Sequence, residues 1–251
     1  MNESIKDSFK KTRAAGIIAA GALDELVKLI KPGISTGEID KLCYEFIQDH
    51  GAYSAPLFYR GFPKSCCTSV NHVVCHGIPS DKILKEGDIV NVDVTAYKDG
   101  WHGDTSRMFE VGDVSIKAKK LIKTTYESMM KAIEILRENV QLGDIGSVIQ
   151  KHVEAQGFSV VQDFCGHGIG QSFHKEPTVL HYGKKGTGEK IKSGMIFTIE
   201  PMINIGNYQT KTLNDGWTAV TKDKSLSAQF EHTVGITKDG YEIFTQSKKF
   251  S

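Results

Sequence analysis

The chain has 251 residues, of which 39% are hydrophobic and 24% charged, a composition typical of one large globular domain. Its 31 basic and 30 acidic residues leave a formal net charge of +1, so nothing indicates a nucleic-acid partner. The five cysteines are odd in number and lack a Cys-x-x-Cys spacing, which argues against a disulfide framework and a structural zinc site. We therefore expect a reducing, cytoplasmic location, and no apolar run is long enough to span a membrane.

The first half of the chain predicts two helices followed by strands. Amphipathic patterns cover residues 7–30 and 36–50, and Gly51 stands where a glycine is expected to end a helix. The start of the first pattern superficially resembles a signal peptide. However, Asp24 and Glu25 directly follow its short apolar run, so we interpret it as a helix of the mature protein.

Residues 91–107, NVDVTAYKDGWHGDTSR, predict a β-hairpin. Apolar and polar side chains alternate before Asp99-Gly100, which is a hairpin turn signal. If the turn is centred there, Thr95 faces Asp104, and Asp93 lies diagonal to Asp104 on the same face, with Cβ atoms roughly 7 Å apart. Two carboxylates this close repel each other unless a cation or a shared proton lies between them. The alternative is a polar face exposed to solvent.

The second half of the chain predicts the same order of elements as the first. Helices are expected over residues 117–138 and 143–156, and a strand over residues 225–237. No proline-rich or serine-rich linker separates the halves. We therefore expect a single domain of two similar lobes, covering about residues 1–112 and 113–251.

An internal duplication relates the acidic residues of the two halves. The segment LKEGDIVNVDV aligns without gaps with IKSGMIFTIEP, which places Glu200 at the position of Asp93. The segment SLSAQFEHTVGIT mirrors HGDTSRMFEVG, which relates Glu231 to Asp104. If the two lobes face each other about a pseudo-two-fold axis, all four carboxylates converge.

Such a convergence predicts a metal centre. Four buried carboxylates cannot all stay ionised without compensating charge, and two divalent cations would balance them. Two metals about 3.5–4 Å apart are a known hydrolytic arrangement. His167, in the glycine-rich segment CGHGIGQSFHKEP, is the candidate fifth ligand, because flanking glycines let the backbone approach closely. One imidazole among carboxylates favours borderline or hard ions, so Mn, Fe, Co and Zn all remain possible.

The motifs NVDVTAYKDGWHGDTSRMF, GHGIGQSFHKEP, FTIEPM and SLSAQFEHT closely resemble those of the type I methionine aminopeptidases, and the resemblance runs from about residue 5 to residue 247. It implies an α+β pita-bread fold, with an antiparallel sheet, helices on its outer face and the site between two pseudo-two-fold related lobes. It also implies two divalent metal ions and removal of the initiator methionine from peptides and nascent chains, near the ribosome, when the second residue is small.

The resemblance also implies a role for each ligand. Asp93 would chelate one metal, while Asp104 and Glu231 would bridge both. His167 and Glu200 would complete the shell of the other metal.

Of the three candidate catalytic residues, the two histidines follow from the same resemblance and Glu200 follows from the chemistry of the site. His76, in NHVVCHGIP, matches the histidine that contacts the scissile amide nitrogen. His174 matches the histidine that stabilises the carbonyl oxygen as it becomes tetrahedral. Glu200 is the carboxylate expected to move the proton to the leaving amine. Attack by a metal-activated water needs no acyl-enzyme, so we expect no serine nucleophile.

Selectivity for methionine requires a small apolar pocket. Aromatic rings and a soft sulfur suit a thioether. The candidates are Tyr59, Phe62, Cys67, Phe173 and Trp217. The alternative is that these side chains only pack in the core.

Two rival functions stay open. One is a prolidase-like or aminopeptidase P-like hydrolase of the same fold, although such enzymes generally carry an added N-terminal domain, for which we expect no room here. The other is a non-catalytic relative that binds peptides, although such relatives lose metal ligands and all five are present here. We expect the protein to act as a monomer.

Overall fold

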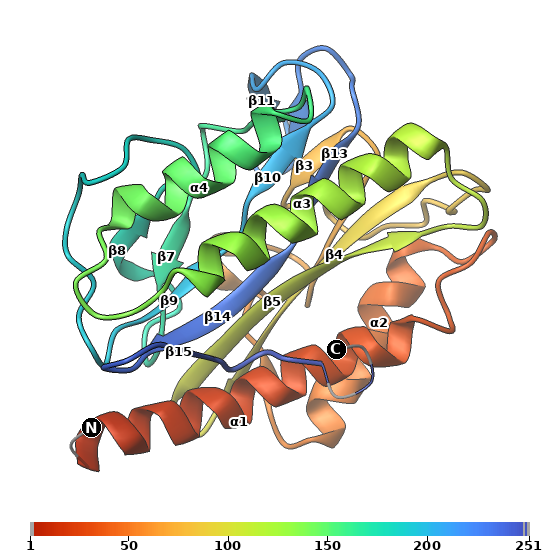
Figure 1. Cartoon of the computed structure of the whole chain (residues 1–251). Coiled ribbons are helices and arrows are strands. Elements are labelled where there is room, and N and C mark those ends of the chain that lie inside the picture. Colours follow the sequence, from red (N-terminus) through yellow and green to blue (C-terminus); the bar gives the residue numbers. More distant parts are fainter. Residues whose placement is uncertain (1–2, 248, 250–251) are drawn as a thin grey trace.

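A computed structural model describes residues 3–247 and 249 of the chain. This part of the chain contains four α-helices, namely α1 (Glu3–Leu26), α2 (Thr36–Asp49), α3 (Ile116–Glu134) and α4 (Leu142–Glu154). Figure 1 shows α1, α3 and α4 in front of the strands. None of the helices described is long and apolar enough to cross a membrane.

Local hydrogen bonds explain where the helices begin and end. The Ser35 hydroxyl accepts the Glu38 amide and the Glu38 carboxylate accepts the Ser35 amide, a capping box that starts α2 as predicted. The first helix ends at Leu26, four residues before the predicted end, because the Leu29 amide donates to the Leu26 carbonyl only three residues back, in a tighter turn than the α-helix. α3 likewise stops at Glu134 rather than at residue 138, so both of these predicted ends were too late.

Antiparallel pairing joins nine of the strands described into one main sheet. The path runs through β1 (Tyr53–Ser54), β4 (Ile89–Lys98), β5 (Trp101–Glu110), β14 (Glu231–Ile236), β9 (Ile196–Ile199), β7 (Gly166–Gly168) and β8 (Lys175–Val179). Off this path, β2 (Cys67–Val70) pairs with β4, and β15 (Tyr241–Ile243) pairs with β14. The middle of the path, β4-β5-β14-β9, brings the two duplicated segments side by side.

Six shorter strands form two small sheets. In one, β10 (Met202–Asn204) lies between β13 (Ser227–Gln229) and β6 (Ser159–Val160). In the other, β12 (Ala219–Thr221) lies between β11 (Thr210–Thr212) and β3 (Val73–Cys75). A single 3₁₀ turn, η1 (Tyr59–Gly61), interrupts the segment between β1 and β2.

The predicted register of the 91–107 hairpin is confirmed. Asp99 and Gly100 both adopt left-handed backbone angles, with φ of 49° and 84°, as a two-residue hairpin turn requires. β4 and β5 then pair Thr95 with Asp104, so that Asp93 and Asp104 lie on one face.

The strand predicted over residues 225–237 was wrong as a single element. It divides at Phe230 into β13, which pairs with β10, and β14, which pairs with β5 and β9. The chain therefore changes sheets at this point, and Glu231 becomes the first residue of β14.

Each half of the chain packs its helices on its own apolar core. Leu23 of α1 and Ile39 of α2 are buried in one cluster with the apolar face of β4. Leu121 of α3 and Ile145 of α4 are buried in a second cluster, which includes Phe197 of β9. The second cluster also includes Ile89 of β4 and Met108 of β5, so the two halves pack against each other across the sheet.

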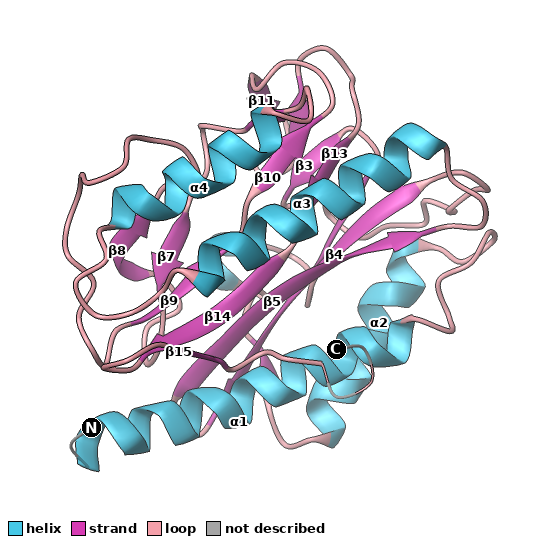
Figure 2. Cartoon of the chain, in the orientation of Figure 1, coloured by secondary structure: helices cyan, strands magenta, loops and turns pink. Residues whose placement is uncertain are grey.

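The contact between α1 and β5 is close enough to require glycine, and Figure 2 shows α1 lying along these strands. A Cβ atom on Gly103 would lie 2.3 Å from the backbone nitrogen of Gly16. Gly103→Ala should therefore force α1 away from the sheet and lower the free energy of unfolding by about 1–3 kcal/mol, as overpacking typically does. Urea denaturation measures the loss. Gly240→Ala is the matched control, because its nearest neighbour lies 3.9 Å away, and an equal loss in both variants would contradict the contact argument.

Candidate metal centre

The five predicted ligands converge where the two halves of the main sheet meet. Asp93 lies on β4, Asp104 on β5 and His167 on β7, while Glu231 begins β14 and Glu200 directly follows β9. All five side chains line one cavity of about 410 Å³. Every other residue predicted for the site lines the same cavity, namely Tyr59, Phe62, Cys67, His76, Phe173, His174 and Trp217.

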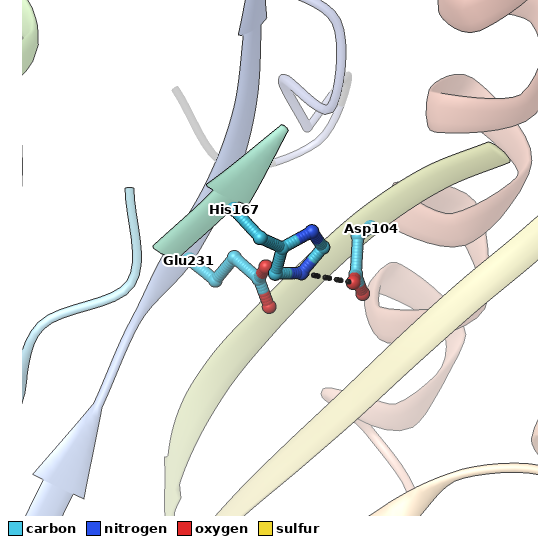
Figure 3. A group of neighbouring side chains, drawn as sticks. All are labelled: Asp104, His167 and Glu231. Carbon is cyan, nitrogen blue, oxygen red and sulfur yellow. Dashed lines mark ion pairs between the residues drawn. The ribbon is translucent and has the colours of Figure 1, made fainter. Parts of the chain in front are cut away.

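Three of these side chains already form a compact ligand group. Ligand atoms of Asp104, His167 and Glu231 lie within 4.8 Å of one another, and Figure 3 shows the imidazole between the two carboxylates. His167 Nε2 is 3.7 Å from Asp104 Oδ2 and 3.6 Å from Glu200 Oε1. A cation among these atoms would therefore contact groups from both halves of the chain.

Burial and mutual repulsion oppose ionisation of the carboxylates. Burial raises the pKa of Asp93 and of Glu231 well above their usual values, and the charges of neighbouring carboxylates raise both further. Burial also raises the pKa of Glu200 to about 7, although His167 and the Thr198 hydroxyl oppose the increase. Burial lowers the pKa of His167, but its close contact with Asp104 and the charges of Glu200 and Asp104 outweigh burial and raise it. The side chains of the cavity alone thus supply too little positive charge to balance the carboxylates.

His76 and His174 stand beside this group in the neutral state at pH 7. Burial lowers the pKa of both, and the charge of His167 helps to lower that of His174 to about 4. His174 Nδ1 is 3.0 Å from the Tyr59 hydroxyl, and its ring centroid is 4.1 Å from that of His167. His76 has a φ of 56°, an uncommon left-handed conformation for a non-glycine residue.

Aromatic rings form the apolar part of the cavity. Phe62 meets Trp217 edge to face at 5.2 Å between centroids, and Tyr59 lies 4.9 Å from Phe173. Burial raises the pKa of the Cys67 thiol well above its usual value, and the nearby carboxylates raise it further. Cys67 therefore stays protonated and offers a soft sulfur rather than a nucleophilic thiolate.

Residues 10–238, most of the chain, match the model of metallopeptidase family M24. This chain belongs to metallopeptidase family M24. Methionine aminopeptidase of Rickettsia prowazekii (strain Madrid E) is 60% identical over 242 residues, which cover 96% of this chain and 93% of the relative. Methionine aminopeptidase of Escherichia coli (strain K12) is 52% identical and covers 96% of this chain and 92% of its own length. The resemblance stated from the motifs is confirmed.

Solved structures of M24 relatives confirm the α+β pita-bread fold. The crystal structure of methionine aminopeptidase from Rickettsia prowazekii matches with a TM-score of 0.95 at 59% identity, over 96% of this chain and 98% of that one. The enzyme from Thermotoga maritima matches with a TM-score of 0.95 at 39% identity, over 98% of both chains. Prolidase from Pyrococcus furiosus matches with a TM-score of 0.78 at 22% identity, over 97% of this chain and 65% of that one, which shows only the shared fold.

The M24 family uses divalent metal, and the residues of this chain fit such an ion. Glu231 Oε1 is buried and has no hydrogen-bond partner among the described atoms. A buried carboxylate oxygen without a donor is costly unless a cation satisfies it. Together with the raised pKa values, this orphaned oxygen indicates that the cavity is built to hold positive charge.

The sequence analysis missed two threonines that hold the predicted metal ligands in place. The Thr198 hydroxyl donates to Glu200 Oε1 at 2.6 Å and accepts the His167 amide at 3.0 Å. The Thr95 hydroxyl donates to Asp104 Oδ1 at 2.7 Å. Strand periodicity could have found Thr198, two residues before Glu200, and the hairpin register already placed Thr95 opposite Asp104. Such partners orient metal ligands and raise their affinity.

His181 is another support that the motifs did not indicate. Its Nε2 accepts the backbone amide of Glu200 at 3.1 Å, and burial lowers its pKa to about 3. The imidazole therefore stays neutral and satisfies an amide that lies just beyond the end of β9. This bond fixes the backbone from which the Glu200 carboxylate projects.

Proposed function

We propose that this chain is a methionine aminopeptidase that removes the N-terminal methionine from peptides and nascent proteins, with a preference for a small second residue. The convergence of every predicted ligand, histidine and pocket residue on one cavity carries this proposal. Relatives of that name at 60% and 52% identity over nearly the whole chain support it.

Five side chains would hold two divalent ions. In this proposal, Asp93 would hold one ion, His167 and Glu200 would hold the other, and Asp104 and Glu231 would serve both. The oxygen-rich ligand set with one imidazole suits Mn, Fe, Co or Zn. When bound, such ions supply Lewis acidity, which polarises a carbonyl and lowers the pKa of water to near neutrality.

The residues of the chain supply proton transfer and orientation. Glu200 lines the cavity beside His167 and is suited to carry a proton from the attacking water to the leaving amine. If His174 Nδ1 accepts from the Tyr59 hydroxyl, its proton sits on Nε2, which can then donate to the developing oxyanion. His76 would hold the scissile amide nitrogen.

The aromatic part of the cavity would select the methionine side chain. Phe62 and Trp217 present perpendicular rings, and Tyr59 and Phe173 add a second pair. Aromatic rings attract a thioether sulfur, and the protonated Cys67 adds a polarisable contact. A methionine at the first position would therefore bury its side chain here.

The remaining proposals concern the setting of the reaction. All five cysteines are free thiols, which accords with a cytoplasmic enzyme acting on nascent chains near the ribosome. We further propose that the enzyme works as a monomer, with a single domain whose lobes cover about residues 1–112 and 113–251.

A peptide assay tests the proposed function. The purified protein should release methionine from Met-Gly and Met-Ala peptides but leave Ala-led peptides intact. A chelator should abolish release and added divalent ion should restore it, because the carboxylate cavity requires the cation. Amino-acid analysis of the products measures both. Release that is indifferent to chelator, or equal cleavage of Ala-led peptides, would reject the proposal.

The role of Glu200 predicts the outcome of an isosteric substitution. Glu200→Gln should reduce kcat at least about 10²-fold, since the amide cannot carry the proton. Its circular dichroism spectrum and melting temperature should show an intact fold. Glu189→Gln is the control, because it removes the same charge from an exposed side chain that does not line the cavity, and it should keep full activity. Near-normal turnover in Glu200→Gln would contradict the role of Glu200.

Substitution of either catalytic histidine should lower turnover without lowering the metal content of the protein. His76→Ala and His174→Ala should each lower kcat about 10²-fold, because each removes a hydrogen bond made to the reacting amide. Elemental analysis of the purified variants should find the metal content of the wild type. Loss of metal in either variant would instead make that histidine a ligand.

A further inference from the structure

The mouth of the cavity carries one strongly basic side chain. The part of the chain that the structure describes contributes a single Lys or Arg to the cavity lining, and that residue is Arg60. Arg60 is exposed to solvent, unlike the buried ligands deeper in the same cavity. The proposed metal centre and methionine pocket leave Arg60 without a role.

A rigid turn presents Arg60 at this position. Arg60 lies in η1, with Phe58 just before it, and both adopt left-handed backbone angles, with φ of 48° and 66°. Non-glycine residues seldom adopt these angles, and such residues are concentrated at functional sites. The Phe58 amide donates to the Phe62 carbonyl at 2.8 Å, and the Phe62 amide donates to the Tyr59 carbonyl at 2.9 Å. The turn is therefore closed by its own backbone and holds the arginine at the opening.

The guanidinium of Arg60 is stacked on an aromatic ring and has no acidic partner. Its central carbon lies 5.3 Å from the centroid of the Tyr59 ring. Among the described residues, no carboxylate forms an ion pair with it. Stacking on a ring leaves the N–H groups at the edge of the planar guanidinium free to bind a carboxylate.

Arg60 also lies close to the place where the peptide bond would be cleaved. The centroid of the Tyr59 ring is 5.2 Å from that of His174, so two ring contacts join the guanidinium to His174. An extended peptide advances about 3.3 Å per residue. The third or fourth residue of a substrate that leaves the cavity by this route would therefore reach Arg60.

We propose that Arg60 forms a subsite for an acidic side chain, Asp or Glu, at the third or fourth residue of the peptide substrate. The subsite rests on the proposed function, because it takes the peptide to be bound with its first carbonyl at His174. Asp163, the other charged residue in the outer lining, accepts a hydrogen bond from the Thr210 hydroxyl at 2.6 Å. Its negative charge would repel an acidic side chain, which confines the subsite to the turn that carries Arg60.

Four peptides measure the preference, namely Met-Ala-Asp-Ala, Met-Ala-Asn-Ala, Met-Ala-Ala-Asp and Met-Ala-Ala-Asn. In the metal-loaded wild type at low salt, kcat/KM for the better Asp peptide should exceed that for its Asn partner about 2–5-fold, as an exposed charge pair allows. The ratio should fall towards one as salt is raised, because salt screens exposed charges. It should be about one in Arg60→Ala and below one in Arg60→Glu. Taking the ratio within each variant cancels any general change in activity.

Lys64→Ala is the matched control. Lys64 follows the same turn, but its Nζ lies 3.8 Å from Asp40 Oδ2. The substitution therefore removes one positive charge, as Arg60→Ala does, without changing the mouth of the cavity. This variant should keep the wild-type ratio. A wild-type ratio of one, or a preference that survives in Arg60→Glu, would overturn the subsite alone. Failure of the wild type to release methionine from any of the four peptides would overturn the proposed function and the subsite together.

Discussion

The site depends on one electrostatic constraint. Four carboxylates share one buried cavity, so they need positive charge to balance them. Burial raises the pKa of Asp93, Glu200 and Glu231, so without a cation the cavity favours their protonated forms. If selection acted only on folding stability, apolar side chains would be expected in place of these four carboxylates. The surrounding hydroxyls of Thr95 and Thr198 instead hold the oxygens in place for a cation. The carboxylate cluster thus lowers the folding stability of the chain but provides a site for metal.

The order of strands in the main sheet explains how a duplicated sequence builds one centre. β4 and β5 of the first half meet β14 and β9 of the second half in mirrored order, so equivalent acids face each other across the β5-β14 boundary. Asp93 and Asp104 project from within their strands, whereas Glu200 and Glu231 stand at strand ends. The extra methylene of glutamate gives the second pair a longer reach from these outer positions. The first half thus uses the shorter aspartate within its strands, and the second half uses the longer glutamate at the ends of its strands.

Local chemistry made part of this arrangement predictable. The Asp99-Gly100 turn determines its hairpin register from two residues, and the register alone placed Asp93 and Asp104 on one face. The repeat then supplied the opposing acids. The break at Phe230 could not be predicted in the same way. It arises because the residues before Phe230 pair with β10, whereas the residues after it pair with β9. His181 was missed for a similar reason, since only the folded chain brings it to the Glu200 amide.

The contact between Gly16 and Gly103 has a consequence for how related sequences are interpreted. Neither residue lines the cavity, yet a side chain on Gly103 would meet the backbone of α1, and a side chain on Gly16 would meet the backbone of Phe244, just after β15. Selection for metal chemistry and selection for this backbone contact would have the same effect, because each makes a position invariant among related sequences. Glycine invariance at 16 and 103 would then report the fit of a helix to a sheet, and a search for catalytic residues by invariance alone would count both falsely.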